Sequence, residues 1–435
     1  MDAPELVSIE SVLAYLPEIV LCGVIVALLL LNVIGIKKAE FYVVIAGLVV
    51  QLFFVDANVF KITMGAAAII TILLSGSQQR TEFYVLITAV LLGASLLVTS
   101  TSFIIILLSM ETISLSSYVL TSGTDQDKRR AEAAWKFFIY GSVATAVMVF
   151  GMSYYFGASG SISFTEVSQK SVLISIGGIM ILGGFLFKMT AAPFHLWAPD
   201  VYQATPAPIV AFLSVVPKLA AISVILKAVA SLGFTNIIAA AALLSIIVGT
   251  LAALSQADAK RMMAYSSVAQ AGIMLSAIAA GAIPALIFYA IVFAIMNYAV
   301  FIVIDLKKET AFTEFSGLGY SNPFATIAVT LALVSLVGIP PVAGFMAKLF
   351  VFTGVWSQYN ATGGLSYLAL FVTGLLATVA SLFFYLKIPF YGFFRKAEGK
   401  EPIKISLLSN LLLIILVGLL LALFVAPGLA DGLGY

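Results

Sequence analysis

Lysines and a glutamate that fall inside long apolar segments are the residues of this sequence that could do chemistry. The lysines in question are Lys136, Lys188, Lys218, Lys227, Lys348 and Lys387. A charged lysine at the centre of a bilayer costs about 2.5–3.5 kcal/mol even on a lenient scale. Burial disfavours the charged form of an amine or a carboxyl, whereas pairing favours both charges, so separating such a pair releases or captures a proton. Proton transfer is therefore the chemistry that these residue types could perform.

Depth within the apolar segment separates these lysines. Lys218 lies twelve residues from Pro206 and thirteen from Ser231, too far from either surface for its ammonium to reach water easily, so we predict a functional role. A lysine near a helix end can instead lift its charge to the membrane interface. This structural explanation is favoured for the three lysines closest to segment ends, Lys136, Lys227 and Lys387.

The acidic partner is Glu111, near the middle of its apolar segment and without a basic residue within one helical turn. Its partner must come from another helix, and we predict a pairing with Lys188. The alternative is a fixed ion pair that only holds helices together. His195 could relay a proton, but a capping or packing role in its turn rich in Trp and Pro is at least as favoured. Lys136 is a further accessory candidate.

The composition indicates whether the helices that position these residues lie in water or in lipid. The 435 residues are 62% apolar and 10% charged, whereas ordinary globular domains are about 25% charged. That apolar content supplies about 13 spans of about 20 residues. The apolar stretches are continuous rather than alternating, which excludes an outer-membrane barrel. The sequence therefore predicts an all-α polytopic membrane protein embedded in the lipid bilayer.

The counts of charge and of metal-binding residues exclude other classes. A net charge of +2 gives no support for a nucleic-acid partner. The single Cys22 and single His195 cannot build an iron–sulfur cluster or a zinc site, and a haem would lack axial ligands. We expect no cofactor and no metal in this chain, and no redox chemistry within it.

Apolar stretches punctuated by charges, Gly and Pro predict about 14 transmembrane helices in a single transmembrane domain over residues 1–435. Their approximate limits are 11–36, 41–55, 62–75, 83–98, 102–121, 133–157, 171–190, 206–231, 236–255, 262–280, 283–305, 323–356, 365–393 and 405–426.

Two of these helices are predicted to be broken. Residues 323–356 would form a rod of about 50 Å, but the hydrocarbon is about 30 Å thick. Gly338-Ile339-Pro340-Pro341 interrupts it, and Lys348 opens the second part. The segment 171–190 is likewise followed by Pro193 and Pro199. Counting from Lys170 places Lys188 about 27 Å away, near the cytoplasmic face.

The broken helices are the seventh and the twelfth, five apart. Interrupted helices at corresponding positions are typical of inverted-repeat transporters. We predict two inverted five-helix repeats, the fourth to eighth helices over 83–231 and the ninth to thirteenth over 236–393. Helices over 11–75 precede the repeats, and a C-terminal helix over 405–426 follows them.

The basic loop residues predict the orientation, because cytoplasmic loops carry the excess of Lys and Arg. Loops after even-numbered helices contain only Lys61 and Lys170. Both termini are therefore expected outside. The loops after odd-numbered helices hold Lys37, Lys38, Arg80, Lys128, Arg129, Arg130, Lys260, Arg261, Lys307, Lys308, Arg395, Lys396, Lys400 and Lys404.

Three motifs give the chain a resemblance to a known family. They are FKMTAAPFHLWAPDVYQ at residues 187–203 with its continuation to Lys218, KRMMAYSS at 260–267, and GIPP at 338–341 followed by Lys348. Together they resemble the antiporter-like membrane subunits of respiratory complex I, over nearly the whole chain. Lys348 stands where subunit M is expected to carry Glu, and the sequence ends without the long lateral helix of subunit L.

The resemblance implies a function and a set of residues. It implies proton translocation through Glu111, Lys188, Lys218 and Lys348, coupled to quinone reduction, and it places Lys188 near the bilayer midplane. NADH, FMN, iron–sulfur clusters and quinone would belong to partner subunits, and the partners would include subunit M and small membrane subunits. The implied location is the bacterial inner membrane with periplasmic termini. Gln270 stands where several relatives have histidine.

Two other functions stay open. A subunit of a multisubunit sodium/proton antiporter would share the fold without redox coupling. A structural membrane subunit would contain the same buried lysines as inert groups. Neighbouring redox or antiporter genes would separate the first two, and unchanged proton transport after loss of Lys218 would favour the third.

Overall fold

The computed structural model describes residues 13–56, 58–123, 127–164, 171–396 and 405–428. Lys170, Lys400 and Lys404 of the charge count, and the first two residues of the predicted 11–36 helix, lie outside them. Within the described ranges the chain is helical, and its extended pairing is limited to two isolated bridges. Ten of the described helices are long and apolar enough to cross a membrane, as expected of a membrane-embedded chain.

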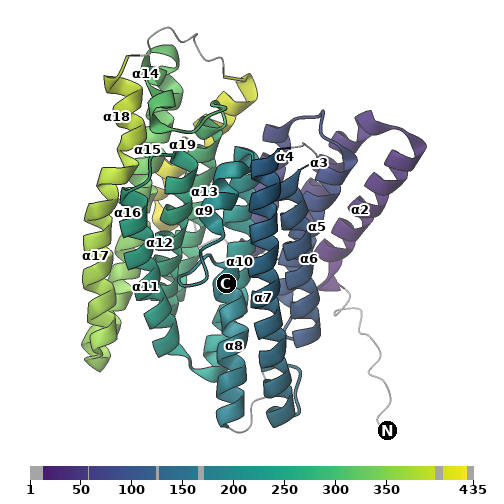
Figure 1. Ribbon diagram of the computed structural model, residues 1–435, viewed down its shortest axis with the longest axis vertical. Coiled ribbons are helices and arrows are strands. Elements are labelled where there is room, and N and C mark those ends of the chain that lie inside the picture. The colour runs from purple at the N-terminus through teal and green to yellow at the C-terminus, as the bar shows by residue number, and fades with distance from the viewer. Residues whose placement is uncertain (1–12, 57, 124–126, 165–170, 397–404, 429–435) are drawn as a thin grey trace.

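The helices stand side by side in one bundle, with α2 to α4 at one edge and α15 to α19 toward the other (Figure 1). Their bounds are α2 Leu16–Ile34, α3 Lys37–Phe53, α4 Val59–Ser75, α5 Thr81–Thr99, α6 Phe103–Ser122, α7 Lys128–Ser159, α8 Val172–Lys188, α9 Ala198–Ala204, α10 Ala207–Leu232, α11 Thr235–Leu254, α12 Ala259–Ala279, α13 Ile283–Ile304, η2 Phe312–Phe315, α14 Leu318–Ser321, α15 Pro323–Val337, α16 Ala343–Thr362, α17 Leu365–Tyr385, α18 Lys387–Phe394 and α19 Leu407–Val425.

The predicted segments agree with these helices to within a few residues, and both predicted breaks are present. The segment 323–356 divides into α15 and α16, and a short α9 follows α8 after a turn rich in Pro. The assignment of several basic residues to loops was wrong. Lys61 lies inside α4 and is buried, and the first turns of α3, α7 and α12 contain Lys37, Lys38, Lys128, Arg129, Arg130, Lys260 and Arg261. The predicted helix 365–393 also divides, because Leu386 separates α17 from α18.

Two structural features occur once in each half of the chain, the first half being α5 to α10 and the second α11 to α18. The residue directly before the second helix of each half makes an isolated bridge: Ser102 with Ser163, and Asp258 with Ala311. In each half a lysine of the last helical segment also donates to carbonyls at the end of the first helix. Lys227 binds the oxygens of Val98 and Ser100, and Lys387 those of Leu254 and Gln256.

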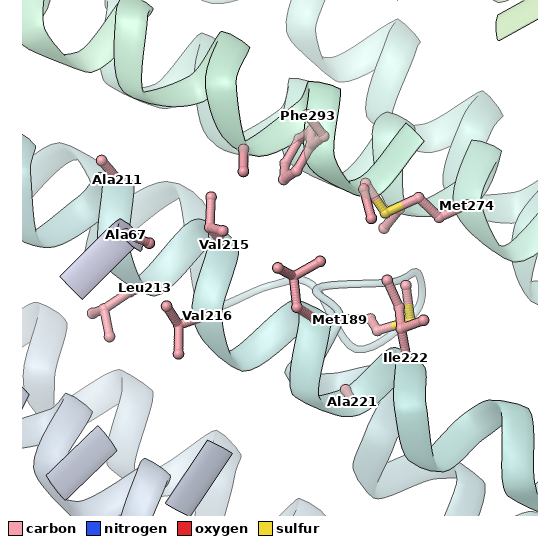
Figure 2. Packing of buried hydrophobic residues seen from close by; sticks show 14 of the residues in the cluster. Ala67, Met189, Ala211, Leu213, Val215, Val216, Ala221, Ile222, Met274 and Phe293 are labelled. Atoms are coloured by element: carbon pink, nitrogen blue, oxygen red, sulfur yellow. The ribbon is translucent and has the colours of Figure 1, made fainter. Parts of the chain in front are cut away.

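The packed core centres on α10. This helix contacts α4, α5, α8 and α13, and its middle residues are almost all buried. Figure 2 shows Val215 and Ile222 of α10 in the same cluster as Met274 of α12 and Phe293 of α13. A lysine in such a helix has no path to solvent except through its protein neighbours.

Candidate functional site

Lys218 lies in the middle of α10 and is 1% exposed. Its ammonium donates to the backbone oxygen of Ser267 at 2.8 Å and to the hydroxyl of Ser267 at 2.7 Å. The Tyr202 hydroxyl donates to the same Ser267 hydroxyl at 3.3 Å, and the ring of Phe293 is 5.0 Å from the ammonium. The buried lysine therefore has neutral partners, from α9, α12 and α13, and no carboxylate within ion-pair distance among the described residues.

Lys188 is the last residue of α8 and lies beside the first break. Its ammonium is buried and has no hydrogen-bond partner in the described part of the chain. It lies about 6 Å from the ring centres of Tyr118, Phe137 and Phe187. Aromatic faces attract a cation without accepting its protons. Lys188 is thus enclosed by aromatic rings, and no hydrogen bond among the described residues holds its ammonium in one position.

The count that put Lys188 near the cytoplasmic face treated 171–190 as a complete span. At about 1.5 Å per residue, the 17 residues of α8 reach about 26 Å, which is short of the hydrocarbon thickness of about 30 Å. The long helix α7 packs against both α8 and α9, so the two short helices follow one another along its length. Lys188 is therefore at an internal end of a divided helix.

Glu111 does not pair with Lys188 in this structure. Its carboxylate accepts a hydrogen bond of 2.6 Å from the hydroxyl of Thr145 in α7. No ion pair within 4 Å joins it to Lys188 among the described side chains. Phe137, which faces Lys188, and Thr145 are eight residues apart on α7, about 12 Å along the helix. The predicted pairing is not formed, and α7 contacts both groups.

Lys348 lies in α16 beside the second break and is 5% exposed. Its ammonium donates to the oxygen of Val337, the last residue of α15, at 2.8 Å. The carbonyl end of a helix carries partial negative charge, which favours a cation there. The N–H of Gly344 donates to the Ser335 hydroxyl at 2.9 Å and holds the two half-helices together.

A hydrogen-bonded group around Gln270 connects α12 to the second break. The Gln270 amide donates to the oxygen of Leu336 at 3.2 Å and to the hydroxyl of Tyr385 at 3.0 Å. The hydroxyl of Tyr289 donates to the Gln270 amide oxygen, and Ser266 shares a hydrogen bond with Tyr385. Leu336 precedes Val337, which binds Lys348. Ser266 is the chain neighbour of Ser267, so this group lies between the residue that binds Lys218 and the residue that binds Lys348.

These neutral partners were missed by the sequence analysis. Ser267 and Tyr202 appear there only as letters of motifs, Gln270 appears only as a departure from a histidine, and Tyr289 and Tyr385 resemble ordinary aromatic residues of an apolar helix. Hydroxyl and amide side chains are common in apolar helices and give no periodic signal. Only the packing of α9, α12 and α17 around α10 and α15 identifies them.

The accessory candidates, Lys136 and His195, make no hydrogen bond to Lys188, Lys218 or Lys348 among the described residues. Lys136 is half-exposed and pairs with Glu132 and Asp200, each at 2.8 Å, while Arg261 pairs with Asp200 at 2.6 Å. Lys136, Glu132 and Asp200 line a polar pocket of about 430 Å³. His195 is buried in the turn between α8 and α9, and its backbone oxygen accepts from Ala198. Its Nδ1 has no hydrogen-bond partner among the described residues.

The described residues hold no group of three or more His, Cys, Asp or Glu side chains placed to bind a metal. Buried lysines, hydroxyls and amides are groups that bind and pass protons. The chemistry that these groups can perform is therefore the uptake and release of protons at the lysines of α8, α10 and α16.

Comparisons with known proteins identify a family to which this chain is similar. The family described as "NADH:quinone oxidoreductase/Mrp antiporter, TM" matches residues 100–377. The chain is 33% identical over 393 residues to NADH-quinone oxidoreductase subunit N 2 of Chloroherpeton thalassium, covering 84% of this chain and 76% of that protein. It is 36% identical to NAD(P)H-quinone oxidoreductase subunit 2 of Nostoc punctiforme, covering 76% of this chain and 66% of that protein.

Solved structures show the same relationship. A chain of respiratory complex I from Thermus thermophilus matches with a TM-score of 0.86 and 31% identity, covering 95% of this chain and 98% of that one. A chain of the Mrp complex from Dietzia sp. matches with a TM-score of 0.82 and 16% identity, over 97% of this chain and 96% of that one. The second likeness concerns the fold alone.

Proposed function

Because the chain belongs to the family of membrane subunits described as NADH:quinone oxidoreductase/Mrp antiporter, we propose that it carries protons across a membrane through Glu111, Lys188, Lys218 and Lys348. Among its relatives it is of the subunit N type of NADH:quinone oxidoreductase. Quinone reduction in partner subunits drives the transfer. This chain provides acid–base groups and no redox centre.

The observation that carries the proposal is a set of three buried lysines that make no ion pair among the described residues. Lys188 and Lys348 lie beside helix interruptions, and Lys218 lies in the middle of α10. A fixed ion pair would hold a lysine in its charged form, whereas a hydroxyl and carbonyls can serve both forms. Lys218 donates only to Ser267, and Lys348 to a backbone oxygen. Each lysine can therefore lose and regain a proton without leaving an unpaired carboxylate behind.

The energy that this transfer needs is modest. Moving one charge against 100 mV takes about 2.3 kcal/mol. A tenfold change in proton affinity corresponds to about 1.4 kcal/mol. A change of about ten- to hundredfold in the proton affinity of a lysine is therefore sufficient. Motion of Glu111 toward or away from Lys188, across the surface of α7, would supply a change of this size.

The proposed setting follows the same relatives. The partners are antiporter-like subunit M and small membrane subunits, and NADH, FMN, iron–sulfur clusters and quinone are held outside this chain. The location is the bacterial inner membrane. Helices over 11–75 and 405–426 flank two inverted repeats over 83–231 and 236–393, an arrangement supported by the bridge and the lysine contact that occur in each half.

Both termini are proposed to face the periplasm. With Cys22 replaced by Ser, an impermeant thiol reagent should label a cysteine introduced at Asp2 in intact cells, and not one introduced at Gln126. Both test positions lie outside the described residues. The reverse pattern would overturn the orientation.

The runner-up is a subunit of a multisubunit sodium/proton antiporter, supported by the fold-level likeness to the Mrp complex. The test is to purify the chain in mild detergent and identify its partners. Copurification with an NADH-oxidising arm supports the proposal, and copurification with antiporter subunits alone contradicts it. NADH-driven proton translocation that is unchanged in Lys218→Ala would favour a purely structural subunit.

A further inference from the structure

A buried ionic cluster lies outside the line of proton carriers, in helices that precede the first half. The ammonium of Lys61 in α4 pairs with Glu18 of α2 at 2.7 Å. Glu18 is 3% exposed and Lys61 is 7% exposed. The hydroxyls of Ser95 and Thr99 in α5 donate to the same carboxylate oxygen, Oε1. The other oxygen of Glu18, Oε2, is buried and has no hydrogen-bond partner in the described part of the chain.

Lys227 connects this cluster to the core helix. It lies in α10, nine residues after Lys218, or about 14 Å along the helix, and is the next titratable side chain of α10 in that direction. Its ammonium donates to the oxygens of Val98 and Ser100, at 2.6 and 2.9 Å. These residues flank Thr99, whose hydroxyl reaches Glu18 at 3.3 Å. A neutral amine has the two N–H donors that these bonds use, so both protonation states suit this site.

The cluster lies at the helix ends opposite the basic loops. Glu18 is near the start of α2 and Lys61 near the start of α4, while Lys37, Lys38 and Arg80 follow the other ends of these helices. Thr99 ends α5, and Lys227 lies in the last two turns of α10. On the orientation proposed above, this is the periplasmic side.

We propose that Glu18, Lys61 and Lys227 form a proton-release site on the outer side of the chain. The inference rests on the proposed proton-carrying function. Lys227 receives a proton from the direction of Lys218, so an N–H bond forms. That bond then breaks as an O–H bond forms at Oε2 of Glu18. The O–H bond breaks in turn as the proton passes to water outside.

Charge explains why the proton leaves the site. The cluster contains one carboxylate and the ammonium of Lys61, and a protonated Lys227 makes its net charge positive. An added proton is repelled by the positive charges of both lysines. Replacement of a buried ion pair by apolar groups of similar volume is often neutral for stability. Stability alone therefore gives little reason for an ion pair at this place.

The experiment uses the whole complex in membrane vesicles and measures protons translocated per NADH oxidised, together with the amount of assembled complex. The double variant Glu18→Gln with Lys61→Met removes both charges at once and leaves no buried charge unpaired. We expect normal assembly and a loss of translocation to the level of Lys218→Ala. Full translocation with full assembly would overturn the proposal, and so would a loss of translocation that only follows loss of assembly.

Two matched controls sharpen the result. Glu40, 1% exposed, is a buried glutamate that accepts from Thr81 in the same group of helices, so Glu40→Gln should leave translocation intact. Lys387 makes the same kind of contact as Lys227, but no Glu–Lys ion pair lies beside it among the described residues, so Lys387→Met should have less effect than Lys227→Met. Equal losses within either pair would contradict the release site. Unchanged translocation in Lys218→Ala would instead contradict the proton-carrying function itself.

Discussion

The two halves of the chain, α5 to α10 and α11 to α18, share connections but differ in charge. Glu111 lies nine residues after the bridge residue Ser102, and Ser267 lies nine residues after its equivalent, Asp258. Lys218 likewise precedes Lys227 by nine residues, where Thr378 precedes Lys387. The second half therefore carries hydroxyls at the positions where the first half carries charges.

The difference teaches which lysines serve the scaffold. A contact that both halves make, such as a lysine binding carbonyls at the end of the first helix, stabilises the architecture. The release site proposed above adds to this contact, at Lys227, the ion pair of Glu18 and Lys61. A charge that only one half carries is not explained by the architecture that the two halves share. Lys218 of the first half donates to Ser267 of the second, which is the position equivalent to Glu111. A neutral hydroxyl there avoids a permanent buried ion pair.

The largest expected effect tests the break in the second half. A Cβ on Gly344 would lie 1.8 Å from the backbone oxygen of Ser335, so Gly344→Ala should force α15 and α16 apart. We expect little assembled complex, measured by native gel electrophoresis of the membranes.

Gly157 provides the control for this prediction, because a Cβ there meets nothing within 4 Å. Gly157→Ala should assemble normally, since alanine favours a helix over glycine by about 0.5–1 kcal/mol. Normal assembly of Gly344→Ala would show that the two half-helices are not held by this close approach.

The next effect separates the unrepeated lysine from the repeated one. Lys218→Ala should slow proton translocation by this chain by about 10²–10⁴-fold, the usual contribution of a positioned acid or base. Lys387→Ala should be mild, because this half-buried side chain makes hydrogen bonds to carbonyls and a contact with the ring of Phe312, and no ion pair among the described residues. NADH-driven proton uptake in vesicles measures both, and equal losses would contradict the distinction between the halves.

A smaller effect is expected at Glu111, whose counterpart is a serine. Glu111→Gln should slow translocation by about tenfold or more, since a nearby opposite charge changes proton affinity by about 1–3 pK units. Glu111→Asp keeps the charge on a shorter side chain and should retain part of the rate. The amount of assembled complex must be measured beside the rate, because loss of the complex in proportion to activity would indicate a structural role only.

The smallest effect concerns Ser267. Ser267→Ala removes the hydroxyl that binds Lys218 but keeps the backbone oxygen at 2.8 Å. A single hydrogen bond contributes about 0.5–1.5 kcal/mol, so translocation should fall by about tenfold or less. A loss as large as that of Lys218→Ala would mean that the hydroxyl itself passes the proton.

The sequence by itself determined the solvent, the helices and the lysines at issue. Continuous apolar segments need lipid around them, because the backbone of each is satisfied only within a helix. Depth within such a segment follows from counting, so the burial of Lys218 was predictable. The break after Val337 was predictable too, because Pro340 and Pro341 cannot continue a helix.

Only the tertiary structure decided which groups face each lysine. Lys61 was predicted in a loop and instead pairs with Glu18, because the partner lies 43 residues away in another helix. Glu111 accepts a hydrogen bond from Thr145 and makes no ion pair with Lys188 among the described residues. Lys218 donates to two oxygens of Ser267, which lies in another helix. The physical reason is that an apolar helix in lipid can present any of its faces to its neighbours. Which face meets which neighbour depends on the packing of the whole bundle, and no local pattern in the sequence records it.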